Sequence, residues 1–489
     1  MGDDAVSGLR LGDLVGCVPA EEAGRLVTGV SVDSRTVGPG HLFVAVPGTK
    51  VDGLRFAASA AAAGAVAVLG EGERPEDLPA DVTYVRVGDA RTALARAASR
   101  MYPRQPETVV AVTGTAGKSS VADFVRQIEA ARGKVSASLG TLGIVTSSGA
   151  SYGGLTTPDP VALHETLERL ATDGITHLAM EASSHGLDQK RLDGVRLAAA
   201  AFTNLGRDHL DYHTTMDAYF HAKMLLFRAL LAADRPAVVN ADGDWSDRAI
   251  AVARETGRRV LTTGRAGETL RVVSAERAGF SQRLEIAHER GTTRVDLPLV
   301  GAFQIENALV AAGLVMAVGA EPEEALLPLA HLVGVKGRLE RVGETNGALC
   351  VVDYAHKPDA LRNVLATLRP LATGKLVVVV GCGGDRDPGK RPIMGRVAVE
   401  GADVAIVTDD NPRSEDPATI RAAMMAGAPG AREIGDRAEA IRAGVAMLEP
   451  GDVLVVAGKG HETGQIVGDR TLPFSDHEEV RAAIEARMR

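Results

Sequence analysis

The chain has 489 residues, a formal net charge of −9 and a pI near 5.8. Its length predicts about three domains, taking roughly 150 residues for each domain. An apolar share of 45% and a charged share of 24% are typical of a soluble globular protein. The acidic balance argues against a surface for nucleic acid or anionic membrane, although an acidic protein can still form a basic pocket for small phosphates.

The cysteines and the apolar stretches indicate the cellular compartment in which the protein is expected. Cys17, Cys350 and Cys382 form neither a CxxC pair nor a zinc-binding spacing, so we expect free thiols in a reducing environment. The N-terminal MGDDAVSGLRLGD lacks the pattern of a signal peptide, and the longest apolar stretches are too short and weakly hydrophobic for a membrane-spanning helix. We therefore expect a cytoplasmic protein with no nucleic-acid partner and no membrane insertion.

Strand-like runs alternate with helical stretches rich in Ala, Leu and Arg along most of the chain. TVVAVTG precedes VADFVRQIEAAR, KLVVVVG precedes RPIMGRVAVEG, and DVLVVAG follows near the end. This alternation predicts an α/β fold with largely parallel sheets. Two loose stretches, 99–108 and 332–343, suggest boundaries between predicted domains at 1–105, 106–336 and 337–489.

The run TVVAVTGTAGKSS combines a strand, a glycine-rich loop and the start of a helix, which is the context of a phosphate-binding loop. Glycines let backbone N–H groups approach phosphates, and the helix adds the positive end of its dipole. Lys118 can reach the β- and γ-phosphates, and Ser119 can offer its hydroxyl to Mg²⁺. The common form, GxxxxGK[ST], would need a glycine at Val112, so this loop is shorter and an ordinary strand-to-helix turn is the alternative.

Two later segments are dense in residues that can bind metal. THLAMEASSHGLDQKR contains Glu181 and His185, and FTNLGRDHLDYHTTMDAYFHAKMLLF contains His209 and Lys223 among other acids and histidines. Oxygen ligands with one or two imidazoles suit Mg²⁺ or Mn²⁺ beside phosphates, although polar loops at strand ends are common. Lys223 lies within apolar helix spacing. It is therefore either a lysine extending from a half-buried face to solvent or a buried lysine with altered chemistry, and spacing alone favours the first.

Taken together, the motifs resemble the Mur ligase family over nearly the whole chain. They occur in the family's order: VDSRTVGPGHLFVAVPGTKVDG, TGTAGKSS, TTPDP, MEASSHGLDQKR, TNLGRDHLDYH…AK, GAFQIEN, GRLER, DYAHKPDA, GCGGDRDPGKRPIM, TDDNPR and GKGHE. The resemblance implies an N-terminal domain that binds the UDP end of the substrate. It also implies a central P-loop ATPase with a mainly parallel sheet and a Rossmann-like C-terminal domain that binds the amino acid.

The resemblance also implies a reaction. The γ-phosphoryl group of ATP passes to the carboxylate of UDP-MurNAc-L-Ala-D-Glu, and an amine attacks the acyl phosphate to form an amide. Catalysis is then mostly positioning and charge neutralisation by Mg²⁺, for which two sites are expected, and by Lys118. We expect only small-molecule partners, namely ATP, the UDP-linked dipeptide and the added amino acid, and a monomeric enzyme.

Site residues carry over from the matching motifs. Ser119, Glu181, His209 and Lys223 resemble the metal neighbours, with Lys223 matching the lysine that this family carbamylates, and Lys118, Glu181, His209 and Lys223 are the candidate catalytic residues. The candidate ATP-binding residues are Gly114, Thr115, Ala116, Gly117, Lys118, Ser119, Ser120, Asn307, Arg338 and Asp353. The candidates for the UDP-linked dipeptide are Val32, Ser34, Thr49, Lys50, Val51, Thr156, Thr157, Ser183, Gln189 and Arg191.

The DNPR motif bears on which amino acid is added. A guanidinium grips a carboxylate with two hydrogen bonds, so Arg413 suits a substrate with a distal carboxylate and would repel the ammonium of lysine. Family members that add diaminopimelate resemble this chain in carrying DNPR, which favours diaminopimelate as the substrate. The candidate pocket residues are Arg386, Asp410, Asn411, Pro412, Arg413, Gly458 and Glu462, with Glu462 meeting the distal ammonium.

The chain departs from the family pattern at four positions. Ala116 stands where a polar residue is usual, Ser119 replaces threonine, Gln304 replaces asparagine and Lys336 replaces proline. The first and third bear on the geometry around ATP, and the last on the stiffness of the second boundary. Two alternatives remain: a lysine-adding ligase of the same family, and a paralogue that binds nucleotide or UDP-sugar without ligating.

Overall fold

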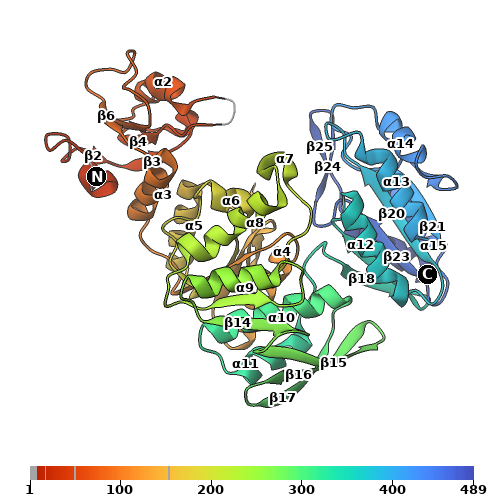
Figure 1. The fold of residues 1–489 in the computed structure, drawn as a ribbon. Coiled ribbons are helices and arrows are strands. Elements are labelled where there is room, and N and C mark those ends of the chain that lie inside the picture. Colours follow the sequence, from red (N-terminus) through yellow and green to blue (C-terminus); the bar gives the residue numbers. More distant parts are fainter. Residues whose placement is uncertain (1–7, 17, 49–50, 152–154, 489) are drawn as a thin grey trace, which may run out of the picture. The chain divides into compact units, whose positions relative to one another are not determined.

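The computed structural model describes residues 8–16, 18–48, 51–151 and 155–488 (Figure 1). The chain divides into two compact units. The first consists of Met1–Val273, Ile286–Thr293 and Glu306–Pro328, and the second of Ser274–Glu285, Arg294–Ile305 and Leu329–Arg489. Three parallel or mainly parallel sheets form their cores, as the alternation of strands and helices predicts.

The first sheet has four parallel strands in the order β3-β4-β5-β6. Apolar side chains pack on both of its faces. The elements of this part are β1 (Leu9–Arg10), α1 (Leu11–Val15), β2 (Leu26–Val27), β3 (Gly29–Ser31), η1 (Ser34–Thr36), β4 (His41–Val44), η2 (Gly53–Phe56), α2 (Ala57–Ala62), β5 (Ala67–Gly70), β6 (Thr83–Arg86) and α3 (Ala90–Met101).

The second sheet has eleven strands in the order β10-β9-β8-β11-β7-β12-β13-β14-β15-β16-β17, and the run from β8 to β15 is parallel. Its strands are β7 (Thr108–Thr113), β8 (Ser136–Gly140), β9 (Gly143–Thr146), β10 (Gly149–Ser151), β11 (His177–Glu181), β12 (Leu197–Phe202), β13 (Ala237–Asn240), β14 (Val260–Gly264), β15 (Leu270–Ala278), β16 (Ser281–His288) and β17 (Gly291–Leu297). Its helices are α4 (Lys118–Ala131), α5 (Pro160–Thr172), α6 (Ser184–Asp188), α7 (Leu210–His213), α8 (Met216–Leu225), the π-helical η3 (Leu226–Leu230), α9 (Ser246–Glu255), α10 (Ala302–Ala317), α11 (Pro322–Leu326) and the 3₁₀ helix η4 (Leu327–His331).

The register of this sheet brings three strand ends together. Glu181 at the end of β11 pairs with Val112 of β7, and Phe202 at the end of β12 pairs with Thr113. The nearly continuous apolar run of β7 is typical of a parallel strand that is covered on both faces. Residues that follow β7, β11 and β12 therefore share the carboxyl edge of the sheet, where α/β proteins bind ligands.

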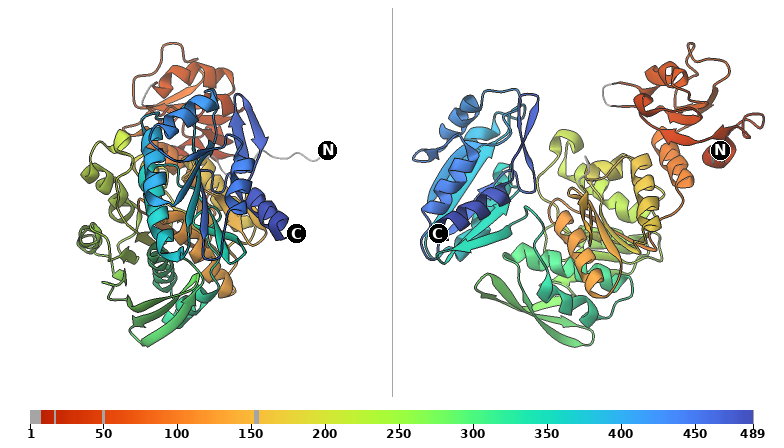
Figure 2. Two further views of the ribbon diagram at one scale, coloured as in Figure 1. Left: turned by 90° about the vertical axis from the view of Figure 1, so that its right-hand side faces the viewer. Right: turned by 180° about the vertical axis from the view of Figure 1, so that it is seen from behind.

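The third sheet has six strands in the order β18-β19-β23-β20-β21-β22, all parallel except β18. Helices α12, α13 and α14 lie on one face and α15 and α16 on the other (Figures 1 and 2). Apolar side chains of these helices pack against the sheet. The elements of this part are β18 (Glu340–Thr345), β19 (Ala348–Asp353), α12 (Pro358–Leu368), η5 (Arg369–Leu371), β20 (Leu376–Cys382), α13 (Lys390–Gly401), β21 (Val404–Asp409), α14 (Pro417–Met425), β22 (Arg432–Glu433), α15 (Arg437–Ala446), β23 (Val453–Ala457), β24 (Gly464–Val467), β25 (Arg470–Pro473) and α16 (Asp476–Met488). Strands β24 and β25 pair with each other in a separate antiparallel sheet.

Both stretches predicted as loose are shorter than expected. Residues 99–101 complete α3, and residues 340–343 begin β18. The prediction was wrong there because prolines and glycines mark only the middle of each connection, whereas the flanking residues continue a helix or join a sheet. The domain boundaries themselves stay predictions.

Two expectations from the apolar stretches and cysteines can be compared with the fold. No helix among the described residues combines the length and apolar character that a membrane crossing requires. Cys350 and Cys382 are free, buried thiols, and burial raises their pKa values to about 12 and about 11. Such thiols are inert packing groups, and Cys17 lies outside the described residues.

Candidate functional site

The loop between β7 and α4 requires glycine at two positions. Gly114 has φ +153°, and a Cβ there would lie 1.9 Å from Oγ1 of Thr203. Gly117 has φ +87°, and a Cβ there would lie 2.2 Å from Oδ1 of Asn307. Any side chain would therefore clash at either position. The loop ends at Lys118, the first residue of α4, so the helix N-terminus faces the same edge as the loop.

Residues after β12 hold this loop in place. Thr203 donates from Oγ1 to the carbonyl of Ala116 (2.7 Å), and the Ala116 N–H donates to Oδ1 of Asn204 (2.9 Å). The Thr115 N–H also donates to the Asn204 carbonyl (2.9 Å). These contacts use only backbone atoms of residue 116, so alanine can occupy this position without loss of loop geometry.

Two lysines converge on one carbonyl of the loop. Lys118 donates from Nζ to the carbonyls of Gly114 (2.7 Å) and Thr115 (3.0 Å), and Lys223 also donates to the Gly114 carbonyl (2.8 Å). Two ammonium groups at one carbonyl repel each other, and Lys118 is the second cause, after burial, of the lowered pKa of Lys223. The ammonium of Lys118 can attract an anion, and a phosphate oxygen would give it a better partner than a neutral carbonyl.

Lys223 is a buried lysine that forms no ion pair with a carboxylate among the described residues. Its side chain is only 1% exposed, and Nζ lies 4.3 Å from the centre of the Tyr219 ring. Burial, with the nearby Lys118, holds its pKa well below the ordinary value, while Asp208 opposes this shift. The half-buried interpretation that spacing favoured is therefore wrong. The reason is that α8 packs between other elements on more than one side, which a single-sequence pattern cannot distinguish.

Ser119 and Glu181 offer two oxygen atoms in the geometry of a hard cation site. Ser119 Oγ donates to Glu181 Oε1 (2.8 Å), and the Thr141 N–H donates to the same oxygen (2.8 Å). Adjacent ligands of an octahedral Mg²⁺ lie ~3 Å apart, so these two oxygens fit such an ion. The described residues contain no group of three or more His, Cys, Asp and Glu side chains arranged for a metal. A cation here would therefore also use hydroxyl, phosphate or water oxygens.

His209 is linked to the phosphate loop through aromatic contacts. Its backbone has φ 53°, and its ring lies 6.0 Å from that of Tyr219 and 4.8 Å from that of His185. The Tyr219 hydroxyl contacts Thr115 Oγ1 (3.3 Å), and burial raises the pKa of Tyr219 to about 12. The imidazole is thus linked to the phosphate loop through one neutral phenol.

The predicted residues for the UDP-linked dipeptide fall into two groups. Thr156 contacts Thr141 through their hydroxyls (3.1 Å), and Thr157 contacts Ser183 in the same way (3.0 Å). Arg191 donates to the Thr157 carbonyl (2.8 Å) and to Gln189 Oε1 (2.7 Å), and burial lowers its pKa. These contacts extend from Glu181 to Arg191 along one edge.

The second group lies in the N-terminal sheet region. Val32 follows β3, Ser34 begins η1 and Val51 precedes η2. Thr49 and Lys50 lie outside the described residues.

The DNPR residues follow β21 at the carboxyl edge of the third sheet. Arg413 has φ 53° and donates to the Gly384 carbonyl (2.8 Å), so its side chain reaches the end of β20. Asn411 is 3% exposed and donates to Glu462 Oε2 (2.8 Å). Arg386 is exposed, and it donates to the Asp385 carbonyl (3.0 Å). The edge therefore presents cationic and anionic groups side by side.

Backbone geometry fixes three further positions at this edge. Gly458 has φ +120°, and a Cβ there would lie 2.6 Å from Asp410 Oδ2. Asp410 Oδ1 accepts the N–H of Asn411 (2.7 Å). The Pro412 carbonyl would lie 1.9 Å from a Cβ on Gly384, so the two loops are in close backbone contact.

Lys459 was not singled out from the sequence, although it belongs to the quoted GKGHE. It is fully buried and donates to Asn411 Oδ1 and Glu462 Oε2, both at 2.9 Å. A lysine between two glycines directly after a buried strand was the available signal. Thr203 and Asn204 were missed in the same way.

The remaining predicted ATP contacts lie in different parts of the chain. Asn307 is buried in α10 beside Gly117. Asp353 ends β19 and accepts the N–H groups of Leu339 and Ala355, each at 2.7 Å, and burial raises its pKa. The guanidinium of Arg338 lies 5.0 Å from the centre of the Tyr354 ring. Gln304 is 1% exposed, so that departure from the family pattern is a core position.

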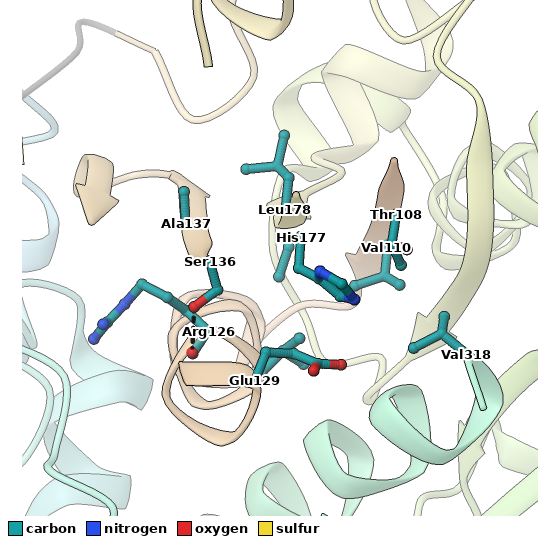
Figure 3. A pocket seen from close by; sticks show the side chains of 11 residues that line it. Thr108, Val110, Arg126, Glu129, Ser136, Ala137, His177, Leu178 and Val318 are labelled. Carbon is teal, nitrogen blue, oxygen red and sulfur yellow. Dashed lines mark hydrogen bonds between the residues drawn. The ribbon is translucent and has the colours of Figure 1, made fainter. Parts of the chain in front are cut away.

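A small pocket lies at the opposite end of the central strands. Thr108, Ser136 and His177 begin β7, β8 and β11, and Glu129 of α4 also lines the pocket (Figure 3). Its volume of about 10 Å³ is the lower limit for one water molecule. It is therefore too small for a substrate, and the candidate site remains at the carboxyl edges.

Comparisons with known proteins match all three parts. The models for the Mur ligase middle domain, the Mur ligase glutamate ligase domain and the Mur ligase family catalytic domain match residues 112–315, 337–460 and 26–102. A protein of Agrobacterium fabrum is 59% identical over 94% of this chain and 93% of its own length. A protein of Bradyrhizobium diazoefficiens is 55% identical over 98% of this chain and all of its own length. Both are named UDP-N-acetylmuramoyl-L-alanyl-D-glutamate–2,6-diaminopimelate ligase.

Solved structures agree at the level of the fold. A structure of a ligase with the same name has a TM-score of 0.74 at 34% identity and covers 99% of this chain and 100% of that chain. The MurF ligase of Thermotoga maritima in complex with ADP has a TM-score of 0.61 at 18% identity, covering 94% of this chain and 97% of that chain. At that identity the second likeness concerns the fold alone.

Proposed function

Because the chain belongs to the Mur ligase family, we propose that it is the ATP-dependent ligase that joins diaminopimelate to the D-Glu of UDP-MurNAc-L-Ala-D-Glu in peptidoglycan precursor synthesis. The observation that carries this proposal is the 55–59% identity, over almost the full length, to ligases of that name. The presence of Arg413 in a DNPR motif supports the choice of amino acid, since a guanidinium fits a distal carboxylate.

The proposed chemistry has two steps. A D-Glu carboxylate oxygen attacks the γ-phosphorus of ATP, so the bond to the bridging β–γ oxygen breaks, ADP leaves and an acyl phosphate forms. The amine of diaminopimelate then attacks the acyl carbon, loses a proton, and the tetrahedral intermediate expels phosphate to leave the amide. A free carboxylate is a poor electrophile, and phosphorylation gives it a good leaving group.

We assign the phosphate loop to the first step. Backbone N–H groups of Gly114–Ser120 and the ammonium of Lys118 would bind the phosphates, and the charge that develops on the transferred group is what they stabilise. The position of Lys118 Nζ at the carbonyls of Gly114 and Thr115 supports an anion at this position. Asn307, Arg338 and Asp353 are proposed to bind the rest of ATP.

We propose Mg²⁺ as the cation at two sites that draw on Ser119, Glu181, His209 and carbamylated Lys223. The 2.8 Å separation of Ser119 Oγ and Glu181 Oε1 supports the first pair. The lowered pKa of Lys223 supports the modification, because carbamylation needs a neutral amine. Glu181 and Ser119 would hold the cation, which would supply neutralisation of the phosphate charge, and His209 is linked to the phosphate loop through Tyr219.

The other substrates are assigned to the residues that the sequence indicates. Val32, Ser34, Thr49, Lys50, Val51, Thr156, Thr157, Ser183, Gln189 and Arg191 are proposed to bind the UDP-linked dipeptide. Arg386, Asp410, Asn411, Pro412, Arg413, Gly458 and Glu462 are proposed to bind diaminopimelate. The continuous contacts from Glu181 to Arg191 support the first assignment, because they extend from the phosphate site to where a carboxylate substrate must lie.

Domain limits, oligomeric state and compartment complete the proposal. We propose domains at 1–105, 106–336 and 337–489, and each family match falls within one of them. A monomer is proposed because one chain supplies every assigned residue. The compartment is proposed to be the cytoplasm because ATP and UDP-linked precursors are made and used there.

The test is phosphate release from ATP in the presence of UDP-MurNAc-L-Ala-D-Glu. Meso-diaminopimelate, LL-diaminopimelate and L-lysine are compared at equal concentration, with mass spectrometry of the tripeptide product. Turnover with a diaminopimelate isomer well above that with lysine is the expected result. A preference for lysine would contradict the role of Arg413, and no ADP release with any of the three would favour a paralogue that binds without ligating.

A further inference from the structure

A buried lysine connects two of the residues proposed to bind diaminopimelate. Lys459 has no solvent-exposed surface, and its Nζ donates to Asn411 Oδ1 and Glu462 Oε2, each at 2.9 Å. The Glu462 side chain is 31% exposed. The lysine therefore reaches the carboxylate from the protein interior, while part of the carboxylate faces solvent.

This lysine fixes the orientation of the Asn411 amide. Oδ1 of Asn411 accepts from Lys459 Nζ and from the N–H of Ile466 (2.9 Å), and both of these groups can only donate. The amide nitrogen must then point the other way, where it donates to Glu462 Oε2 (2.8 Å). One carboxylate oxygen thus receives two donors, and the network has only one satisfied arrangement.

The lysine also changes the charge that a ligand meets. Its ammonium compensates the carboxylate of Glu462, and at the same sheet edge the positive charges of Arg413 and Arg386 face the negative charges of Asp410 and Asp385. A distal group with an ammonium alone would bring no carboxylate to the guanidinium of Arg413. A distal group with an ammonium and a carboxylate carries no net charge and can place each against an opposite partner.

We propose that Lys459 is a positioning residue that sets the preference for an amino acid whose distal group bears both an ammonium and a carboxylate. It acts through Glu462 and Asn411 and does not touch the substrate. The inference rests on the proposed function and deepens it, because it assigns selectivity to a buried charge as well as to the half-buried guanidinium of Arg413.

The experiment measures kcat and KM of the full-length enzyme for meso-diaminopimelate, LL-diaminopimelate and L-lysine. Lys459→Met removes the charge and the donor at similar length, and Lys459→Arg retains the charge. Lys375→Met is the matched control, because Lys375 is an exposed lysine of the same sheet region. Lys459→Gln, which retains an N–H donor without the charge, replaces the methionine variant if that variant fails to fold.

In Lys459→Met we expect KM for the preferred diaminopimelate isomer to rise about tenfold, since hydrogen bonds to charged groups are worth this much. The KM for ATP stays within twofold of the wild type. The ratio of kcat/KM for diaminopimelate to that for lysine falls, because an uncompensated Glu462 attracts a lone ammonium. Lys459→Arg retains most of this ratio, and Lys375→Met leaves all constants unchanged.

Failure of the inference and failure of the proposed function would give different kinetic results. An active wild type whose ratio is unchanged in Lys459→Met and Lys459→Gln would overturn the inference and leave the proposed function standing. Equal losses for diaminopimelate, lysine and ATP would also overturn it, because a merely structural lysine would act in that way. A wild type without turnover on either diaminopimelate isomer would overturn the proposed function and the inference with it.

Discussion

The second and third sheets each have one fully buried lysine at the carboxyl edge, Lys223 at the second sheet and Lys459 at the third. The surroundings of the two lysines are opposite. Lys223 donates to one neutral carbonyl and lies over a tyrosine ring, with the ammonium of Lys118 close by. Lys459 donates to the carboxylate of Glu462 and to an amide oxygen. The first lysine has no countercharge among its described contacts, and the second has one at 2.9 Å.

This difference decides what each amine can do. A buried ammonium without a countercharge favours its neutral form, and the neutral amine is the nucleophile that combines with CO₂. A buried ammonium paired with a carboxylate keeps its charge and orients its partners. We infer that residues at the carboxyl edge of the second sheet perform the chemistry and that residues at the carboxyl edge of the third sheet select the amino acid. Variants at the two edges should therefore lose activity in different ways.

The largest effect is expected for Lys118→Ala. Removing this cation should lower ADP formation by about 1,000-fold with every amino acid, because the transferred phosphoryl group loses a preorganised donor. The measurement is ADP release under saturating substrates. A variant with normal turnover would contradict the phosphate-loop assignment. A loss of activity confined to diaminopimelate would contradict the inference that chemistry and amino-acid selection belong to different sheet edges.

Lys223→Ala should lose about 100-fold in kcat, again with every amino acid. Added acetate or another small carboxylate should restore part of the activity, because it can occupy the place of the carbamate. Labelling with ¹³C-bicarbonate gives an independent measurement: a carbamate signal present in the wild type should vanish in Lys223→Ala and persist in Lys459→Met. The lowered pKa of Lys223 predicts that the signal forms below the pH at which an exposed lysine reacts. Full activity in Lys223→Ala would exclude the modification.

Arg413→Ala should raise KM for diaminopimelate by about 10- to 100-fold, which corresponds to a lost hydrogen bond between charged groups. The kcat with saturating diaminopimelate and the KM for ATP should change little, unlike in the two central variants. Steady-state kinetics with diaminopimelate and lysine provide the measurement. Arg413→Lys is the control, since it retains the charge without the bidentate geometry. An equal fall in kcat for both amino acids would remove the selector role.

The sequence predicts features formed by neighbouring residues well, but it predicts contacts between distant strands poorly. The loop at Gly114–Ser119 was predictable because strand, glycines and helix follow one another directly. Thr203 and Asn204, which hold that loop, lie about 90 residues further along, and only the parallel register of β12 with β7 brings them there. Lys459 was missed for the same reason, since its partner Asn411 is on another strand end. Spacing alone predicted that Lys223 lies on a half-buried face. The resemblance to the Mur ligase family predicted instead a buried lysine with altered chemistry, and the structure shows that it is buried.

The smallest effect, and the most direct comparison, concerns stability in paired methionine variants. Lys223→Met in bicarbonate-free buffer should leave the thermal midpoint unchanged or raise it, because it replaces a buried amine whose charged form is disfavoured by burial and by Lys118 with an apolar group of similar size. Lys459→Met should lower stability by about 1 kcal/mol, since Glu462 and Asn411 lose a donor while the partly exposed carboxylate keeps some hydration. Calorimetry of both variants beside Lys375→Met measures this.

The sign for Lys223→Met also follows from its pKa: the folded state binds fewer protons than the unfolded state below the ordinary lysine pKa, so burial of this amine costs stability at neutral pH. Destabilisation of equal size in the two variants would mean that the countercharge at Lys459 makes no energetic difference.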